Sequence, residues 1–121
     1  IPPDLGYGDL SSFGGSPTSE TPHLDSMVHD GMRFTSMYSA SPVCSPSRSS
    51  VMTGRLMTRT GVWPMVFSPN SRGGMALNET TLPQVLRDQA GYDTFMAGKW
   101  HLGVGENGEY LPYNRGFSHY Y

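Results

Sequence analysis

The sequence predicts an α/β fold with a largely parallel central sheet. Segments with the apolar spacing of helices alternate along the chain with short segments rich in β-forming residues. Two of the helical segments also follow a threonine, carry an early proline and close on a glycine. Such alternation is typical of a parallel sheet covered by helices, and ligands in these folds bind beyond the carboxyl ends of the strands. Polar side chains that directly follow a strand are therefore the first candidates for a functional site.

The first helix is predicted to begin at Pro22 and to end at Gly31. Thr21 precedes it as a capping residue, and proline suits the first helical position because its missing N–H needs no partner there. One buried stripe is expected, which consists of Leu24, Met27 and Val28. Residues 32–38 follow with Phe, Thr and Tyr at a density that is typical of a strand.

Two further helices are predicted. A short one spans 47–53 and stops at Gly54. Residues 56–78 contain two prolines and an adjacent pair of glycines without a sustained period, which indicates a long ordered loop or a hairpin. The last helix is capped by Thr81 and ends at Gly91. Its apolar side comprises Leu82, Val85, Leu86 and Ala90. A short β-rich run then leads into a loop that carries Lys99 and His101.

Composition and charge exclude several classes of function. The 121-residue chain has a net charge of −2 and a pI near 6.0, which argues against a strongly basic surface for nucleic acid. No run approaches the ~18 consecutive apolar residues of a membrane span. The single cysteine cannot form an internal disulfide. With 15 glycines and 10 prolines, we expect many turns and few long elements.

Cys44 is the most informative residue of the chain. A lone cysteine is most often a small, buried apolar side chain. Here, however, Pro46 follows two residues later, and Arg48 lies at the i+4 spacing that places two side chains on one helix face. The pattern puts Cys44 at or just before a helix N-terminus, where backbone N–H groups and the helix dipole favour an oxyanion or a sulfate group.

Two segments carry a resemblance to a known family. The run 44–55, Cys-Ser-Pro-Ser-Arg-Ser-Ser-Val-Met-Thr-Gly-Arg, resembles the sulfatase signature, and 91–103, Gly-Tyr-Asp-Thr-Phe-Met-Ala-Gly-Lys-Trp-His-Leu-Gly, resembles the second signature of that family. The resemblance extends over nearly the whole chain and is strongest to the arylsulfatases of animals. It implies an alkaline-phosphatase-like sandwich, of which residues 1–121 are expected to be the N-terminal part of the catalytic domain, truncated at both ends.

The resemblance implies a sulfuric ester hydrolase of the arylsulfatase type. In the family, a formylglycine-generating enzyme oxidises the signature cysteine to formylglycine, here Cys44. The hydrated aldehyde attacks the sulfur of an aryl sulfate or of a sulfated lipid or sugar, and its second hydroxyl then allows sulfate to leave. The implied catalytic residues are Cys44, Arg48 holding the charged diol, Lys99 binding the substrate sulfate, and His101 holding or protonating a diol hydroxyl. Judged without the resemblance, Arg48 is a solvent-facing helix residue and Lys-Trp-His an exposed turn.

The family also binds a divalent cation, Ca²⁺ or Mg²⁺, and hard oxygen ligands suit both. Its ligands are an Asp-Asp pair, a later Asp-Asn pair and the formylglycine. Asp4 and Cys44 match this pattern, whereas Pro3 occupies the first aspartate position. Without the resemblance, Asp4 would simply begin an Asp-Leu-Gly turn.

Asn78-Glu79-Thr80 is an N-glycosylation sequon on a predicted loop. Together with the resemblance it favours a lysosomal or extracellular protein of the secretory pathway.

Two other interpretations stay open: a phosphonate monoester or phosphodiester hydrolase of the same superfamily, and a non-catalytic sulfatase-like fragment. The isolated chain is expected to be inactive, because strand edges and one face of its sheet would be exposed.

Overall fold

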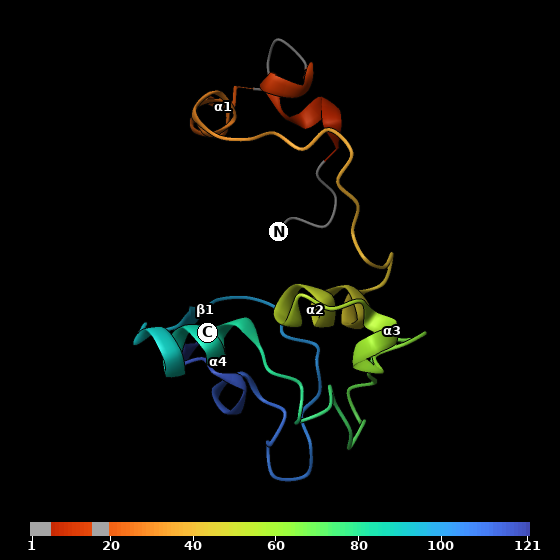
Figure 1. Cartoon of the computed structure of the whole chain (residues 1–121). Helices are drawn as coiled ribbons and strands as arrows, with labels where there is room; N and C mark the ends of the chain where they lie inside the picture. The colour runs from red at the N-terminus through yellow and green to blue at the C-terminus, as the bar shows by residue number, and fades with distance from the viewer. Residues whose placement is uncertain (1–5, 16–19) are drawn as a thin grey trace. The chain divides into compact units, whose positions relative to one another are not determined.

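The structure, a computed structural model, describes residues 6–15 and 20–121. The chain divides into two units, Ile1–Met37 and Tyr38–Tyr121 (Figure 1). Asp4, the predicted metal ligand, and Pro3 beside it lie outside the described residues. The other predicted site residues all belong to the second unit.

The first unit is organised around the carboxylate of Asp25. Its elements are two 3₁₀ turns, Tyr7–Asp9 and Ser11–Phe13, and helix α1, Pro22–Asp30. Asp25 accepts hydrogen bonds from Ser12 N (3.0 Å), from Thr21 Oγ1 (3.3 Å) and from Ser11 Oγ. These bonds, with that from Ser11 the strongest, lower the pKa of the Asp25 carboxyl. The helix is confirmed, but the Thr21 hydroxyl bonds Ser11 and Asp25 and, contrary to the prediction, caps no backbone N–H of the helix.

Two expectations for this part of the chain are wrong. The stripe on α1 is not buried, since Leu24 is 44% and Met27 70% exposed. Residues 32–38 form no strand; they are exposed, and no described strand pairs with them. A strand needs neighbours that satisfy its backbone groups and cover one of its faces. A composition with high β-propensity was therefore not enough to make residues 32–38 a strand.

The second unit combines helices with a small parallel sheet. Its elements are α2 (Cys44–Thr53), α3 (Met57–Thr60), α4 (Leu82–Ala90), β1 (Phe95–Met96), a 3₁₀ helix (Pro112–Arg115) and β2 (His119–Tyr120). β1 and β2 pair in parallel with Phe95 opposite His119, so the α/β class with parallel pairing is confirmed at this scale. Among the described helices, none is long and apolar enough to cross a membrane.

The helices of this unit begin and end for recognisable reasons. α2 begins at Cys44, three residues before the predicted start, because Pro46 is tolerated in the first turn, where a missing N–H costs no hydrogen bond. α4 has the predicted limits: Thr81 caps it, with Gln84 N donating to Thr81 Oγ1 and Thr81 N donating to Gln84 Oε1 (2.8 Å). Gly91 then ends α4 in the left-handed conformation. α3 lies inside the segment that was predicted as a loop.

The core of the second unit includes the loop that follows β1. Its buried apolar residues are Val62, Met75, Trp100, Leu102 and Phe117. Trp100 packs edge-to-face on Phe117 at 6.1 Å between ring centroids and donates its indole N–H to Tyr110 O (2.8 Å). The Lys-Trp-His segment is thus anchored in the core and is not an exposed turn.

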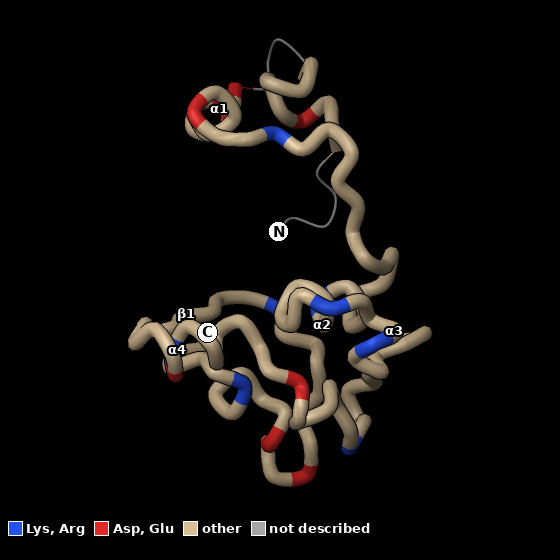
Figure 2. The backbone as a smooth tube through the Cα atoms, in the orientation of Figure 1, with Lys and Arg blue, Asp and Glu red and all other residues tan. Residues whose placement is uncertain are grey.

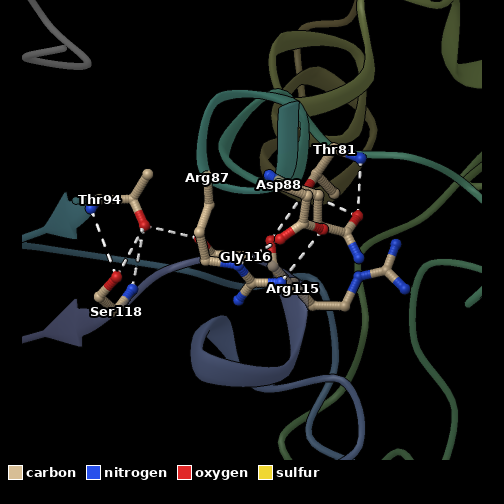
Figure 3. A network of polar contacts seen from close by, with 8 residues as sticks. Thr81, Arg87, Asp88, Thr94, Arg115, Gly116 and Ser118 are labelled. Carbon is tan, nitrogen blue, oxygen red and sulfur yellow. Dashed lines mark hydrogen bonds and ion pairs between the residues drawn. The ribbon is translucent and has the colours of Figure 1, made fainter. Parts of the chain in front are cut away.

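Arg115 organises the backbone that precedes α4, and Figure 3 shows it beside Thr81, the residue that caps this helix. It is only 1% exposed, and its guanidinium donates to the carbonyls of Ala76 (3.2 Å), Leu77 (3.2 Å) and Glu79 (2.8 Å). Thr81 Oγ1 donates in turn to Arg115 O (2.7 Å). Burial lowers the pKa of the guanidinium. The three carbonyls accept from its Nη1 and Nη2 groups, whereas its Nε is buried without a partner among the described residues. One side chain thereby ties the C-terminal segment to the start of α4.

Replacing Arg115 by Met should therefore destabilise the protein by about 3 kcal/mol or more, because three carbonyls lose charged donors. Urea unfolding measures the loss. The matched control is Arg87→Met, since Arg87 is 38% exposed and bonds only the neighbouring Asp88 (2.7 Å); its cost should stay within about 0.5 kcal/mol. Equal losses for the two variants would contradict the role given to Arg115.

Candidate active site

Cys44 is the first residue of α2; its predicted place at or just before a helix N-terminus is confirmed, although the helix starts three residues earlier than predicted. Val43 before it is extended (φ −118°, ψ 156°), so the chain turns into the helix at the cysteine. The thiol is exposed and forms no disulfide. The first N–H groups of a helix have no partner within it and favour a negative charge nearby. Cys44 therefore lies where an anionic group would be stabilised.

Lys99, which is 55 residues away in sequence, reaches the same place. Its Nζ lies 3.5 Å from Cys44 Sγ. Arg48, one turn further along α2, donates from Nη1 to Lys99 O at 2.6 Å and so fixes the backbone that carries the lysine. α2 and the segment after β1 accordingly lie side by side (Figure 1). Lys99 is thus brought to the cysteine, and Arg48 on the same helix as Cys44 holds the lysine backbone.

Neither cation is neutralised by a carboxylate in the part of the chain that the structure describes. The arginines that form ion pairs there are Arg55, Arg72 and Arg87. Figure 2 shows basic positions on α2 and α3 and no acidic position on either helix. Arg48 Nε is also buried and has no hydrogen-bond partner among the described residues. The site retains positive charge and an N–H donor for an anionic group.

His101 is held in an unusual conformation. It is the only non-glycine residue with positive φ (59°) in the described chain. Its Nε2 lies 2.9 Å from Phe67 O, and its Nδ1 is buried without a partner among the described residues. Because a carbonyl can only accept a hydrogen bond, Nε2 is the donor in this contact, and the neutral form of the ring would carry its lone pair on Nδ1.

Two glycines allow the loop that carries His101 to approach the segment around Gly74. Gly103 pairs with Gly74 in an isolated antiparallel bridge, and Met75 N donates to Leu102 O at 2.9 Å. Gly103 has φ 111°, and a Cβ atom built on it would lie 2.4 Å from Gly74 Cα. Only two glycines permit this contact, which fixes the position of the loop two residues beyond His101.

Comparison with known proteins identifies the chain. A family model described as Sulfatase matches residues 4–121. The chain belongs to the sulfatase family. It is 54% identical to arylsulfatase A of Bos taurus and 52% identical to that of Homo sapiens, in each case over 94% of this chain and 22% of the relative. Arylsulfatase G of Rattus norvegicus is 50% identical over 98% of this chain and 22% of the relative. The predicted resemblance to the arylsulfatases of animals is thereby confirmed.

Solved structures also match this chain. The crystal structure of Ps i-CgsB matches with a TM-score of 0.82 and 33% identity, over 97% of this chain and 25% of that one. The same protein in complex with k-i-k-neocarrahexaose matches with a TM-score of 0.81 and 32% identity. The sulfatase chain thus spans about a fifth of its curated relatives and a quarter of this structural one.

The described part of this sulfatase does not assemble a metal site by itself. Of the two predicted ligands, Cys44 is described and Asp4 is not. Within residues 6–15 and 20–121, no three His, Cys, Asp or Glu side chains gather as a metal site would require. A Ca²⁺ ion takes six to eight oxygen ligands. The described donor set therefore does not fit such an ion without further residues.

Sequence reasoning missed several residues that shape the site. Ser45 and Phe67 contact His101, but a buried hydroxyl and a backbone carbonyl leave no signal in a single sequence. Arg55 pairs with both oxygens of the buried Glu79 (2.7 and 2.8 Å). The Ser47 hydroxyl lies 2.8 Å from the Ser39 hydroxyl.

A hollow of about 380 Å³ adjoins the site. Phe67, Lys99, Trp100, His101 and Tyr120 are among the residues that line it, whereas Cys44 is not. The hollow therefore shares Lys99 and His101 with the candidate site, and most of its other lining residues are apolar.

Gly103→Ala should displace this loop and cost more than about 3 kcal/mol, because a strained φ is combined with a backbone clash. Gly98→Ala is the matched control: its φ is 115°, but a Cβ atom there would meet nothing within 4 Å. The control should cost about 1–3 kcal/mol for the backbone conformation alone. Thermal unfolding followed by tryptophan fluorescence measures both values. A loss for Gly103→Ala no larger than that of the control would exclude the close contact.

Proposed function

We propose that this chain is part of the catalytic domain of a longer sulfatase, with an alkaline-phosphatase-like sandwich, that hydrolyses sulfate esters of the arylsulfatase type. The observation that carries the proposal is the placement of Cys44 at the start of α2 with Lys99 Nζ 3.5 Å from its sulfur. The identity to arylsulfatases over 94% of the chain supports it. The cysteine is modified to formylglycine by a formylglycine-generating enzyme, and its sulfur marks where the oxygens of the hydrated aldehyde would lie.

Formylglycine, once hydrated, supplies a hydroxyl that attacks sulfur and a second hydroxyl whose deprotonation lets sulfate leave. Lys99 binds an oxygen of the substrate sulfate as a compact positive charge. Arg48 holds the Lys99 backbone through Nη1 and offers its buried Nε–H to the group at residue 44. His101 keeps its proton on Nε2, bound to Phe67 O, and uses the lone pair of Nδ1 to accept a hydroxyl proton and return it.

A divalent cation, Ca²⁺ or Mg²⁺, belongs to the proposal for the longer protein. Asp4 and the modified Cys44 would be two of its ligands, and the remaining carboxylates would come from outside the described residues. The cation would neutralise sulfate oxygens and lower the pKa of a coordinated hydroxyl.

The substrate class proposed is an aryl sulfate or a sulfated lipid or sugar. A phosphonate monoester or phosphodiester hydrolase could use the same groups, because phosphoryl and sulfuryl oxygens carry similar charge. The ratio of kcat/KM for 4-nitrophenyl sulfate and for methyl 4-nitrophenyl phosphate separates the two. A non-catalytic relative would turn over neither ester.

The full-length protein from a eukaryotic secretory pathway should contain formylglycine at residue 44. Mass spectrometry of the tryptic peptide Phe34–Arg48 detects the aldehyde directly. Cys44→Ala should abolish turnover of 4-nitrophenyl sulfate, whereas Ser50→Ala, also on α2, should leave turnover within about threefold because its hydroxyl bonds only Pro46 O (3.3 Å). An unmodified thiol, in cells that modify a known sulfatase, would refute the proposal.

We also propose that Asn78 carries an N-linked glycan and that the protein is lysosomal or extracellular. Asn78 and Thr80 are exposed, and the sequon lies in a turn just before α4. Thr80→Ala should remove the mobility shift that peptide N-glycosidase produces, and Thr80→Ser should keep it, since serine preserves the acceptor sequence. A shift that persists in Thr80→Ala would place the glycan elsewhere.

A further inference from the structure

Ser45, the residue after Cys44, connects three segments of the site. Its side chain is fully buried, at 0% exposure. Its hydroxyl donates to His101 O at 2.7 Å and accepts from Phe67 N at 3.2 Å. One short side chain thus joins the first turn of α2 to two loops that are 22 and 56 residues away in sequence.

These contacts close a ring of hydrogen bonds around His101. The Phe67 N–H donates to the Ser45 hydroxyl, this hydroxyl donates to the His101 carbonyl, and the His101 ring donates from Nε2 to Phe67 O (2.9 Å). The histidine is therefore held at both its backbone and its ring. A non-glycine residue at φ 59° persists only where its surroundings hold it, and the Ser45 hydroxyl bonds its carbonyl directly.

We propose that Ser45 is a positioning residue for the reaction: its hydroxyl fixes the backbone of His101 and of Phe67, and thereby directs Nδ1 of the ring toward the group formed at residue 44. This inference rests on the function proposed above, in which Nδ1 exchanges a proton. Ser45 directly follows Cys44 in the chain. The same closed set of hydrogen bonds therefore determines the position of the reacting carbon of residue 44 and that of the proton acceptor, Nδ1 of His101. Orientation of this kind strongly affects rate, since a displacement of about 1 Å can cost ~100-fold.

Ser49 provides a matched comparison. It lies on the same helix and is equally buried, at 0% exposure, but its hydroxyl bonds Pro46 O (2.7 Å) and Thr60 Oγ1 (3.1 Å). Neither of these two hydrogen bonds joins Ser49 to the loop that carries His101. A purely structural role of a buried α2 hydroxyl should therefore show equally at both positions.

The test uses the full-length sulfatase with the variants Ser45→Val, Ser45→Thr, Ser45→Ala and Ser49→Ala. Thr and Val have the same shape, so their comparison isolates the hydroxyl. Turnover of 4-nitrocatechol sulfate is divided by the aldehyde content of residue 44 from mass spectrometry, which removes any effect on modification. We expect Ser45→Val and Ser45→Ala to lower kcat at least tenfold with KM within about twofold, and Ser45→Thr and Ser49→Ala to stay within about threefold.

Each outcome decides. Equal kcat for Ser45→Thr and Ser45→Val, or a kcat of Ser45→Ala equal to that of Ser49→Ala, would overturn the positioning role. If Ser45→Val does not fold, Ser45→Ala decides alone, because it adds no bulk. A wild-type protein that lacks the aldehyde and turnover would instead refute the proposed function, and the role of Ser45 with it.

Discussion

Two hydrogen bonds from α2 to the backbone of the loop after β1 determine how the candidate site is assembled. Arg48 donates to Lys99 O and Ser45 donates to His101 O. The donors lie on the helix that begins with Cys44, and the acceptors flank the buried Trp100. Without these bonds, Lys99 and His101 would belong to a separate loop. With them, Cys44, Lys99 and His101 are carried by one hydrogen-bonded unit.

The loop accepts these bonds because it is fixed from its other side. Trp100 and Leu102 are buried in the core at 6% and 1% exposure, and Gly103 lies against Gly74. Apolar and polar residues therefore alternate along this loop, so that its odd-numbered side chains, Lys99 and His101, are left for the site. Burial of the even-numbered ones supplies the stability that a loop with a left-handed histidine requires.

The arginines of this unit have two kinds of surroundings. Arg55 and Arg115 stabilise the fold: Arg55 forms an ion pair with the buried Glu79, and Arg115 donates hydrogen bonds to three backbone carbonyls. Arg48 and Lys99 form no ion pair among the described residues and keep their charge for an anion. In the proposed enzyme, this part of the chain supplies anion binding and proton exchange. The metal-binding carboxylates would come from Asp4 and from residues beyond those described.

The sequence by itself determined the local features. Thr81 and Gly91 delimit α4 because capping and left-handed turns depend on neighbouring residues, and the spacing from Cys44 to Arg48 defines one face of α2. Family membership also followed from short, contiguous signatures. Only the tertiary structure decided that residues 32–38 stay unpaired and that β1 pairs with β2. It also decided that Ser45 and Phe67 hold His101. These outcomes depend on partners far away in sequence, on buried hydroxyls and on backbone carbonyls, which every sequence contains and no local pattern distinguishes.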